Sequence, residues 1–516
     1  MLSSHPMIRL IMLLAFASRA ALAAPVRLEQ YRPHDFVFAA AESGNPFDVE
    51  LWGEFSGPQG ARMRIPGFYD GGGVWKVRFS PPTPGEWVLR TFSPVPALDG
   101  KTAEGEAAPS SNPKVHGAPR VDSEHPFHFR FEDGSRFFLM GYEADWLWGA
   151  DMLDPARKVM RRLIAQMAER GFTHVMVNVY AYDTPWCPGK SSEWDYGPVS
   201  LYPWAGTNEK PDHSRLNPAF FKIYDGMMDD LLGNGIVAQI MLKVYNKGVN
   251  WPKKGSPDEA RYFRYVAARY QAYPNLIWDF SKEARNERDK DLEKNLIELV
   301  RTGDAYGHLI TAHDDEPYEW DWQRSPTLGF STQQKHADFA AWIVFGRAVR
   351  SRPVLNAEFG YEFGVDKLPT HKNPDQVDWK TLLDRAYRIY FAGGYAVYNY
   401  NNTAWDVVKP DPEPPGMQRW QILKETISSL PYWRMEPHDE LSAGGPCLLE
   451  PGGVSAFYSP GAGIAVNLRG LGAPTPAEWI DTWTGARQSA GTLEPKLLKL
   501  QKPKSFGDAP AVLIVR

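Results

Sequence analysis

The 516-residue sequence predicts a multidomain protein in which a (β/α)8 barrel is flanked by two β-sandwich domains. Strand-like and helix-like stretches alternate from about residue 120 to 434, which is the period and length of such a barrel. Short strands separated by Gly and Pro clusters come before and after this region. Two to four domains are expected at this length. We divide the chain into a leader (1–24), an N-terminal sandwich (25–113), a barrel (114–434) and a C-terminal sandwich (435–516).

The composition describes a globular protein with a sizeable core. Hydrophobic residues make up 43% of the chain and charged residues 23%. The net charge of -5 lacks the basic footprint of a nucleic-acid-binding surface, so no nucleic-acid partner is expected. The chain also has 19 Trp and 13% aromatic residues. That density is typical of proteins that present flat apolar faces to sugars, although part of it belongs to the core.

The first residues have the pattern of a secretory signal peptide. His5 and Arg9 precede an apolar stretch over 10–17, and Ala21-Leu22-Ala23 is a cleavage pattern. We expect cleavage near Ala23 or Ala24 and a secreted or periplasmic protein without membrane contact afterwards. A single membrane anchor is the alternative, but the apolar stretch is too short to span a bilayer. The oligomeric state is not predicted.

Two cysteines, Cys187 and Cys447, are too few for a disulfide framework. They could pair after export or remain free or buried thiols. No pattern of metal ligands occurs, so neither a metal nor a cofactor is expected.

Alternating apolar runs predict the N-terminal sandwich. They cover 36–38, 47–52, 74–79 and 87–92, with Gly and Pro clusters between them. The small, polar residues 103–119 suggest a linker. After residue 437, runs over 454–458, 464–468, 477–480 and 511–515 predict a second, smaller β-domain.

Eight strands are predicted in the barrel region, most of them followed by a helix. The strands cover 136–142, 173–180, 236–244, 275–280, 308–313, 328–332, 353–358 and 394–400. Helices are predicted over 154–170 (with Asp154 as N-cap), 256–273, 286–303, 338–349, 376–392 and 418–430. A doubly wound sheet is the alternative, but no G-x-G-x-x-G follows a first strand.

Two glutamates come at the ends of predicted strands. Glu283 follows the fourth strand and Glu358 ends the seventh. Catalytic residues of these barrels lie at the carboxyl ends of the strands. A pair of carboxyl groups there suggests glycoside hydrolysis, in which one attacks the anomeric carbon and the other protonates the leaving oxygen.

Several phrases carry a family resemblance. Phe68-Tyr-Asp-Gly71 and Pro84-Gly-Glu-Trp87 resemble sandwich domains that precede bacterial hydrolase barrels, and Trp479-Ile-Asp-Thr-Trp-Thr-Gly485 resembles a turn of collagen-binding-like C-terminal sandwiches. With 353–361 and the domain order, the chain resembles the apiosidase-like (β/α)8-barrel glycoside hydrolases of clan A type. The resemblance implies Glu283 as general acid/base and Glu358 as nucleophile.

The sequence departs from the clan at Lys282, where an asparagine usually precedes the acid. A lysine would lower the pKa of Glu283 if the two side chains met. Glu287 and Asp279 are therefore alternative acids. Glu362 is a rival to Glu358, but it lies beyond the strand.

Substrate-binding candidates come from the remaining strand ends and the long second loop. Asp145 and Trp146 follow strand one, with a helix cap and a core ring as the alternative. The aromatic residues of the second loop, including Tyr202 and Trp204, favour sugar stacking over a loop core. The full set is Asp145, Trp146, Asn178, Tyr180, Tyr182, Trp186, His313, Gln333, Tyr398, Asn399 and Trp405.

The sequence therefore predicts a secreted glycoside hydrolase that cleaves O-glycosidic bonds in a polysaccharide or oligosaccharide, by a retaining mechanism with two glutamates. Two alternatives stay open. One is a non-catalytic carbohydrate-binding protein on a degenerate barrel, and the other is an inverting glycosidase with Asp145 as base.

Overall fold

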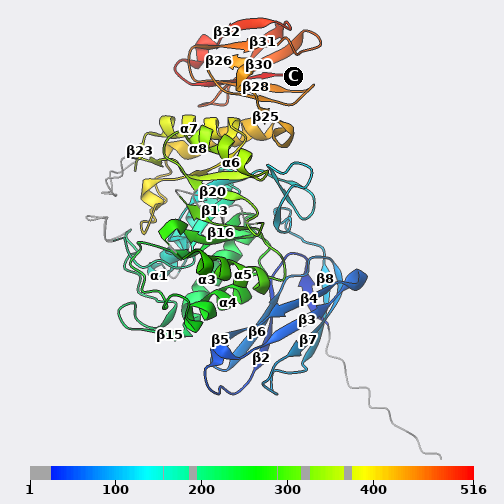
Figure 1. The fold of residues 1–516 in the computed structure, drawn as a ribbon, viewed down its shortest axis with the longest axis vertical. Helices are drawn as coiled ribbons and strands as arrows, with labels where there is room; N and C mark the ends of the chain where they lie inside the picture. Colours follow the sequence, from blue (N-terminus) through cyan, green and yellow to red (C-terminus); the bar gives the residue numbers. More distant parts are fainter. Residues whose placement is uncertain (1–24, 155, 185–193, 287–288, 315–325, 365–374) are drawn as a thin grey trace, which may run out of the picture.

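The computed structural model describes residues 25–154, 156–184, 194–286, 289–314, 326–364 and 375–516. The chain forms three parts along the long axis of the molecule, with the barrel between two β-sandwiches (Figure 1). The predicted fold class is confirmed. The leader, Trp186, Cys187 and Glu287 lie outside the described residues.

Parallel strands form the barrel. Its fifth strand is divided into two short segments, and the ring of strands is continued through them. There β18 and β19 flank Ala312, with β18 paired to β17 and β19 to β20. Every residue of β16 and β17 is buried, as expected for strands covered on both faces. The strands are β12 (Met140–Glu143), β13 (His174–Asn178), β16 (Val237–Val244), β17 (Leu276–Lys282), β18 (Ile310–Thr311), β19 (His313–Asp314), β20 (Ser331–Gln334), β21 (Val354–Glu358) and β24 (Tyr395–Tyr398).

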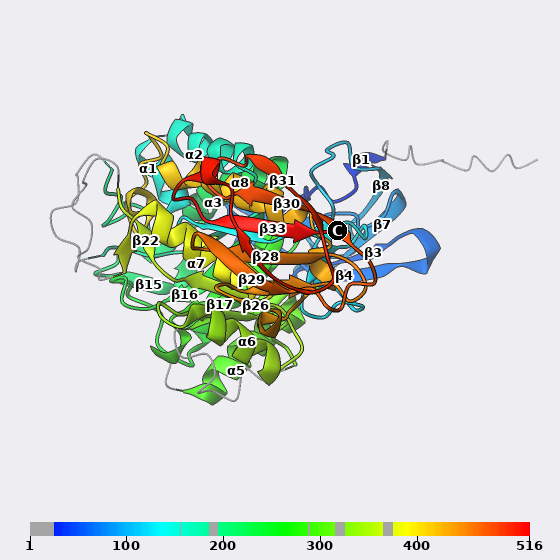
Figure 2. The same ribbon diagram turned by 90° about the horizontal axis from the view of Figure 1, so that it is seen from above.

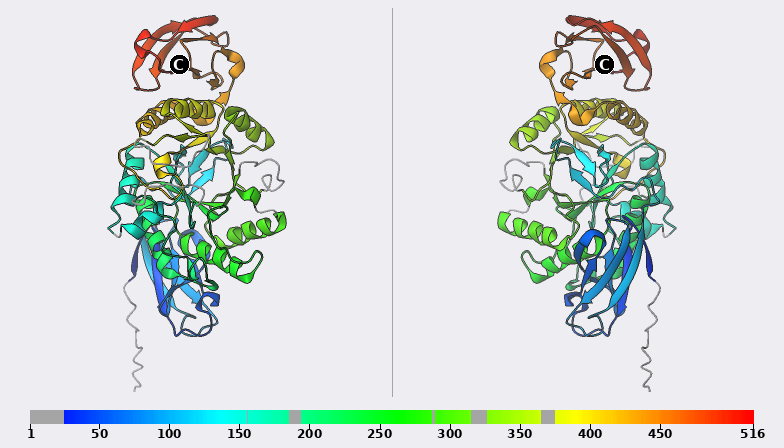
Figure 3. Two further views of the ribbon diagram at one scale, coloured as in Figure 1. Left: turned by 90° about the vertical axis from the view of Figure 1, so that its left-hand side faces the viewer. Right: turned by 90° about the vertical axis from the view of Figure 1, so that its right-hand side faces the viewer.

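Helices surround the strand ring (Figure 3). Side-chain caps start several of them, as where Ser256 accepts the N–H of Glu259. None of the helices in the described ranges combines the length and hydropathy that a membrane crossing requires. The helices are α1 (Ala150–Leu153), α2 (Lys158–Glu169), α3 (Pro218–Gly233), α4 (Pro257–Tyr270), α5 (Lys290–Gly303), α6 (Phe339–Val349), α7 (Trp379–Phe391) and α8 (Pro415–Ser428).

Three differences from the predicted elements matter. Helix α2 begins at Lys158 rather than Asp154, because Arg157 takes a left-handed conformation; Asp154 still accepts the N–H groups of Lys158 and Val159. Strand β17 continues through Lys282, whereas the predicted strand ended at residue 280. Helix α3 was not predicted, although its buried residues recur at the helical period: Phe220, Phe221, Tyr224, Met227, Met228, Leu231 and Leu232.

The N-terminal sandwich has a five-stranded and a three-stranded sheet. Phe55 and Phe79 stack between them, with ring centroids 3.9 Å apart. The expected linker over 103–119 is wrong for residues 103–108, because they belong to β8 (Thr102–Ala108), which pairs with β1 and β7. The strands are β1 (Val26–Glu29), β2 (His34–Ala39), β3 (Trp52–Ser56), β4 (Arg62–Pro66), β5 (Phe68–Gly71), β6 (Val74–Phe79), β7 (Gly85–Phe92) and β8 (Thr102–Ala108).

A small antiparallel sheet follows the N-terminal sandwich. It pairs β9 (Pro119–Val121), β10 (Phe129–Phe131) and β11 (Arg136–Phe137), so the strand expected over 136–142 is divided between this sheet and β12. Two short pairs lie in the barrel's loops: β14 (Trp204–Gly206) with β15 (Pro211–Leu216), and β22 (Tyr361–Glu362) with β23 (Gln376–Val377).

The C-terminal sandwich packs on α7 and α8, and Figure 2 shows it from above. Tyr458 stacks on Tyr387 of α7 at 5.1 Å, and Trp483 meets Trp379 edge-on at 5.2 Å. Cys447 is buried in the core of this sandwich. Its strands are β25 (Glu436–Pro437), β26 (Ser442–Ala443), β27 (Cys447–Leu449), β28 (Ser455–Ser459), β29 (Gly463–Asn467), β30 (Thr475–Asp481), β31 (Arg487–Leu493), β32 (Leu497–Gln501) and β33 (Ala511–Val515).

Candidate active site

Three barrel strands end in charged side chains. Glu143 is the last residue of β12, Lys282 of β17 and Glu358 of β21. Because the strands are parallel, all three ends lie on the same rim of the barrel. This is the end at which barrel enzymes place their catalytic groups.

Lys282 joins three carboxylates. Its Nζ lies 2.9 Å from Glu358 Oε1 and 3.2 Å from Asp145 Oδ2, and it also contacts Glu143 Oε1. All four side chains are 4% exposed or less. Burial opposes the charge on Lys282, but Asp145, Glu143 and Glu358 outweigh it and hold its pKa well above the ordinary lysine value. We call these four residues the Lys282 cluster.

Glu358 is held in one orientation by neighbours from several elements. Gln334 Nε2 donates to its Oε2 over 3.0 Å, and the Tyr361 hydroxyl donates to the same oxygen. His313 Nε2 lies 3.5 Å from Oε1. Burial opposes ionisation, but Lys282, then His313 and His336, outweigh it and hold the pKa of Glu358 below its usual range. The carboxylate is thus kept charged, as a nucleophile requires.

The pKa of Glu143 is shifted in the opposite direction. Burial, and then the negative charge of Glu358, raises the pKa of Glu143 well above the ordinary value, and the contact with Lys282 does not cancel this. The environments of two carboxyl groups in one cluster therefore separate their pKa values, which is a recurrent feature of acid/base sites.

Glu283 follows Lys282 but turns to different partners. Its Oε2 accepts hydrogen bonds from Asn246 Nδ2 at 2.6 Å and from Asn286 Nδ2 at 3.4 Å. The Lys282 ammonium is directed to Glu143, Asp145 and Glu358 instead. The side chains of Lys282 and Glu283 therefore have separate partners. This weakens the objection that Lys282 lowers the pKa of Glu283 and so prevents it from acting as the acid.

Backbone strain collects at this rim. Glu283, Asn246 and Trp405 have left-handed φ values of 56°, 52° and 53°. Non-glycine residues in this region cost about 1–3 kcal/mol each and tend to persist at functional sites. All three follow the ends of barrel strands, so the strain marks the same rim as the charges.

Four other candidates also lie at the strand ends. Asp145 is in the Lys282 cluster and His313 lies against Glu358. Asn178 ends β13, where both polar atoms of its side chain are buried without a hydrogen-bond partner among the described residues. Gln333 is buried in β20. Their role in substrate binding stays a prediction.

The aromatic residues of the second loop form a core rather than exposed stacking faces. Tyr180 is fully buried, stacks on Trp148 at 5.8 Å and meets Tyr202 edge-on at 5.5 Å. Tyr202 and Trp204 pack at 5.1 Å. The expectation of sugar stacking is wrong for these three rings, because other rings cover their faces. Trp146 is also fully buried in the barrel core, so the alternative of a core ring holds there.

Other candidates are divided between the rim and the outer layer. Tyr398 packs against Trp420 of α8 at 5.3 Å and donates to Glu362 over 2.7 Å, so its ring faces the helices and not a substrate. Asn399 Nδ2 donates hydrogen bonds to the carbonyl groups of Ala357 and Val397. Burial raises the pKa of Glu362 to about 7.

Two aromatic candidates remain compatible with the rim. Trp405 stacks on Tyr361 at 4.9 Å and so supports the tyrosine that holds Glu358. Tyr182 is half-buried, and its hydroxyl donates to Glu209 over 2.7 Å. Asp279, an alternative acid, is fully buried and bonded to Gln239, which makes it an interior group.

Sequence reasoning missed three members of the site. Glu143 lies two residues before Asp145 at the same strand end, and that spacing could have drawn attention to it. Gln334 and Tyr361 each lie close to a residue that was predicted. Their partners come from distant parts of the chain, so no local pattern marks them.

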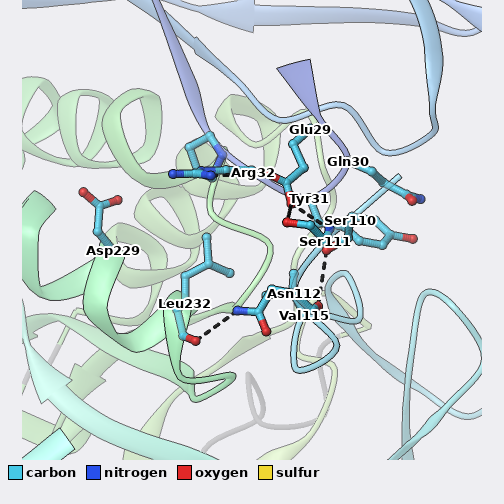
Figure 4. Close-up of a pocket in the computed structure, with 12 residues that line it drawn as sticks. Glu29, Gln30, Tyr31, Arg32, Ser110, Ser111, Asn112, Val115, Asp229 and Leu232 are labelled. Carbon is cyan, nitrogen blue, oxygen red and sulfur yellow. Dashed lines mark hydrogen bonds and ion pairs between the residues drawn. The ribbon is translucent and has the colours of Figure 1, made fainter. Parts of the chain in front are cut away.

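A separate cavity of about 470 Å³ lies between the N-terminal sandwich and α3 (Figure 4). Glu29 and Asp229 are its acidic groups, and the N–H and hydroxyl of Ser111, both at 2.7 Å, donate to the Glu29 carboxylate. The cavity contains no member of the Lys282 cluster. Its lining includes Glu29, Tyr31, Arg32, Ser111, Asn112 and Asp229.

Comparison with known families identifies the barrel. The model of the apiosidase-like catalytic domain matches residues 123–437, which is more than half of the chain. The chain belongs to the apiosidase-like family. It is a glycoside hydrolase, as predicted from the two glutamates at the ends of barrel strands. A domain of unknown function matches residues 27–94 of the N-terminal sandwich. A search of curated proteins found no match.

Solved structures share the fold of this apiosidase-like protein. A Bacteroides vulgatus ATCC 8482 protein, provisionally assigned as a glycoside hydrolase, has a TM-score of 0.78 at 21% identity over 95% of this chain and 99% of that chain. A family 5 glycoside hydrolase from the same organism has a TM-score of 0.59 at 18% identity over 78% of this chain and 94% of that one. At such identities the likeness establishes the architecture alone.

Proposed function

We propose that this apiosidase-like enzyme is an exported, retaining glycoside hydrolase that acts on a plant or microbial polysaccharide or oligosaccharide. The observation that carries the proposal is the state of Glu358, a buried carboxylate at the end of β21 whose neighbours keep it ionised and oriented. The leader pattern over residues 1–24 supports export.

Glu358 and Glu283 divide the chemistry. A Glu358 oxygen bonds to the anomeric carbon while the glycosidic C–O bond breaks, and Glu283 gives its proton to the leaving oxygen. Glu283 then takes a proton from water, whose oxygen attacks the anomeric carbon. The ester bond breaks and Glu358 returns as a carboxylate. The partial exposure of Glu283 suits a group that must exchange protons with water.

The inverting alternative has Asp145 as base. Asp145 is 1% exposed and its Oδ2 lies 3.2 Å from the Lys282 ammonium. Inverting enzymes separate the acid and base carboxyl groups by about 6.5–9.5 Å to admit a water molecule, whereas retaining enzymes hold acid and nucleophile about 5–5.5 Å apart. The anomeric configuration of the first product distinguishes the two mechanisms.

The test is a reducing-sugar screen of the mature protein over plant, algal and bacterial glycans. Glu283→Gln and Glu358→Gln should each abolish release, and Glu362→Gln, a buried glutamate bonded to Tyr398, serves as the matched control. NMR of the first product should show the anomeric configuration of the substrate. Binding of a glycan without release by the wild type would favour the carbohydrate-binding alternative.

A further inference from the structure

The Lys282 cluster contains more negative than positive groups. One ammonium meets three carboxyl groups, all of them buried. The next charges outward are Lys247 with Glu283, and His336 with Asp375, whose Oδ2 lies 3.4 Å from the ring; each pair is of opposite sign and leaves this balance unchanged. Uncompensated buried charge is strongly disfavoured. One of the three carboxyl groups must therefore carry a proton.

The contacts narrow the choice. Glu358 Oε2 accepts hydrogen bonds from Tyr361 and Gln334, and its Oε1 lies 2.9 Å from the Lys282 ammonium, so its charge is stabilised by the protein. Glu143 and Asp145 each have Lys282 as their one side-chain hydrogen-bond donor among the described residues, and Glu143 Oε2 and Asp145 Oδ1 are buried without a partner there. Burial and then the charge of Glu358 raise the pKa of Glu143, so the proton is assigned to Glu143.

We infer that Lys282 is a positioning residue that holds Glu358 ionised and aligned, and that Glu143 is a neutral carboxyl group that holds Lys282. This inference rests on the proposed function, in which Glu358 is the nucleophile. With Glu143 protonated, the free enzyme has Lys282 opposite two anions, Asp145 and Glu358. When Glu358 forms its ester its charge disappears, and Lys282 and Asp145 are left as a balanced pair.

The cluster therefore fits the glycosylated enzyme better than the free one. An interaction that improves along the reaction coordinate accelerates the chemical step, whereas one that is equal throughout does not. The charged and titratable groups that face Glu358 are Lys282, Lys247, Glu143, Asp145, His313, His336 and Tyr361.

Kinetics of four proteins test the inference on whichever glycan the screen identifies. Lys282→Met should reduce kcat about 100-fold or more and move the acid limb of kcat/KM to higher pH by about one unit, because Glu358 loses its main cation. Lys282→Arg should restore part of the rate and return the acid limb of kcat/KM to its wild-type pH. Glu143→Gln should keep the wild-type limb and lose less than about fivefold, because it replaces one neutral group with another.

Two outcomes would overturn the inference. An unmoved acid limb in Lys282→Met would make the lysine a merely structural residue. A Glu143→Gln enzyme as impaired as Lys282→Met, with circular dichroism showing a normal fold, would make Glu143 an anion.

Infrared spectroscopy separates this inference from the proposed function. The wild type at pH 7 should show the carbonyl stretch of a protonated carboxyl group that Glu143→Gln lacks and that Glu298→Gln, which removes an exposed carboxylate, retains. This difference needs no substrate. If no glycan is cleaved but the band is present, the catalytic proposal fails and the protonated Glu143 stands; an absent band refutes the neutral Glu143 even in an active enzyme.

Discussion

Two ion clusters in this molecule combine cations and carboxylates in different proportions. The junction cluster joins the N-terminal sandwich to α3 and α4, with Lys76, Arg78 and Arg269 opposite Asp35, Asp70 and Asp225. Arg269 Nη2 lies 2.7 Å from Asp225 Oδ2, and Arg78 Nε lies 2.6 Å from Asp35 Oδ1. The Lys282 cluster has one cation opposite three carboxyl groups.

The difference in proportion corresponds to a difference in role. Each arginine of the junction cluster makes paired N–H···O bonds to a carboxylate, the geometry that gives strong and specific ion pairs. In the Lys282 cluster, Glu143 Oε2 and Asp145 Oδ1 remain without hydrogen-bond partners among the described residues. A balanced cluster fixes one domain on another, whereas an unbalanced one retains a proton and can change its charge during a reaction.

The largest expected effect is on turnover. Glu358→Ala should reduce kcat by about 10⁴-fold, since it removes the proposed nucleophile, while the melting temperature changes little. Calorimetry and a reducing-sugar assay on the same preparation check both parts. Near-wild-type turnover in this variant would remove Glu358 from the mechanism.

The next effect is on stability. Asp225→Asn leaves Arg78 and Arg269 without their shared partner and should lower the free energy of unfolding by about 3–5 kcal/mol. The kcat per folded molecule should stay as in the wild type. Urea unfolding measures the loss, with the exposed Glu298→Gln as a control expected to cost less than about 0.5 kcal/mol. A stable Asp225→Asn would show that the junction does not depend on its charges.

The junction cluster also predicts acid sensitivity. Burial opposes ionisation of Asp225, but Arg78 and Arg269 outweigh it and lower its pKa to about 2. Because the folded pKa is below the unfolded value, the stabilisation is complete above about pH 4 and is lost as the pH falls through 2, by about 2 kcal/mol. Unfolding free energies measured from pH 5 to 2 should show this slope in the wild type and a shallower one in Asp225→Asn.

Glu362 is a contrasting case, in which burial and not an ion pair shifts the pKa. Its carboxyl group is bonded to the neutral Tyr398 hydroxyl and the Gly416 N–H, and burial raises its pKa to about 7. A raised folded pKa means stabilisation that is present below the unfolded value and is lost as the pH rises through about 7. Glu362→Gln should therefore gain about 3 kcal/mol over the wild type at pH 8 and nothing at pH 4. Equal differences at both pH values would contradict the assignment.

The sequence by itself determined the barrel, the sandwiches and the placement of Glu358. These follow from local periodicity, since an apolar run over 353–357 identifies a buried strand and its last residue must lie at the rim. Glu283 was located by the same logic. Helix α3 had the required period too and could have been predicted.

Only the tertiary structure decided which charges meet. Glu143 and Lys282 are 139 residues apart in the chain, and their contact depends on the closure of the barrel. The same closure decided that Tyr398 faces α8 and that Tyr180 is covered by Trp148. A strand's period specifies alternate faces, but it cannot specify which ring or carboxylate from another strand covers each face.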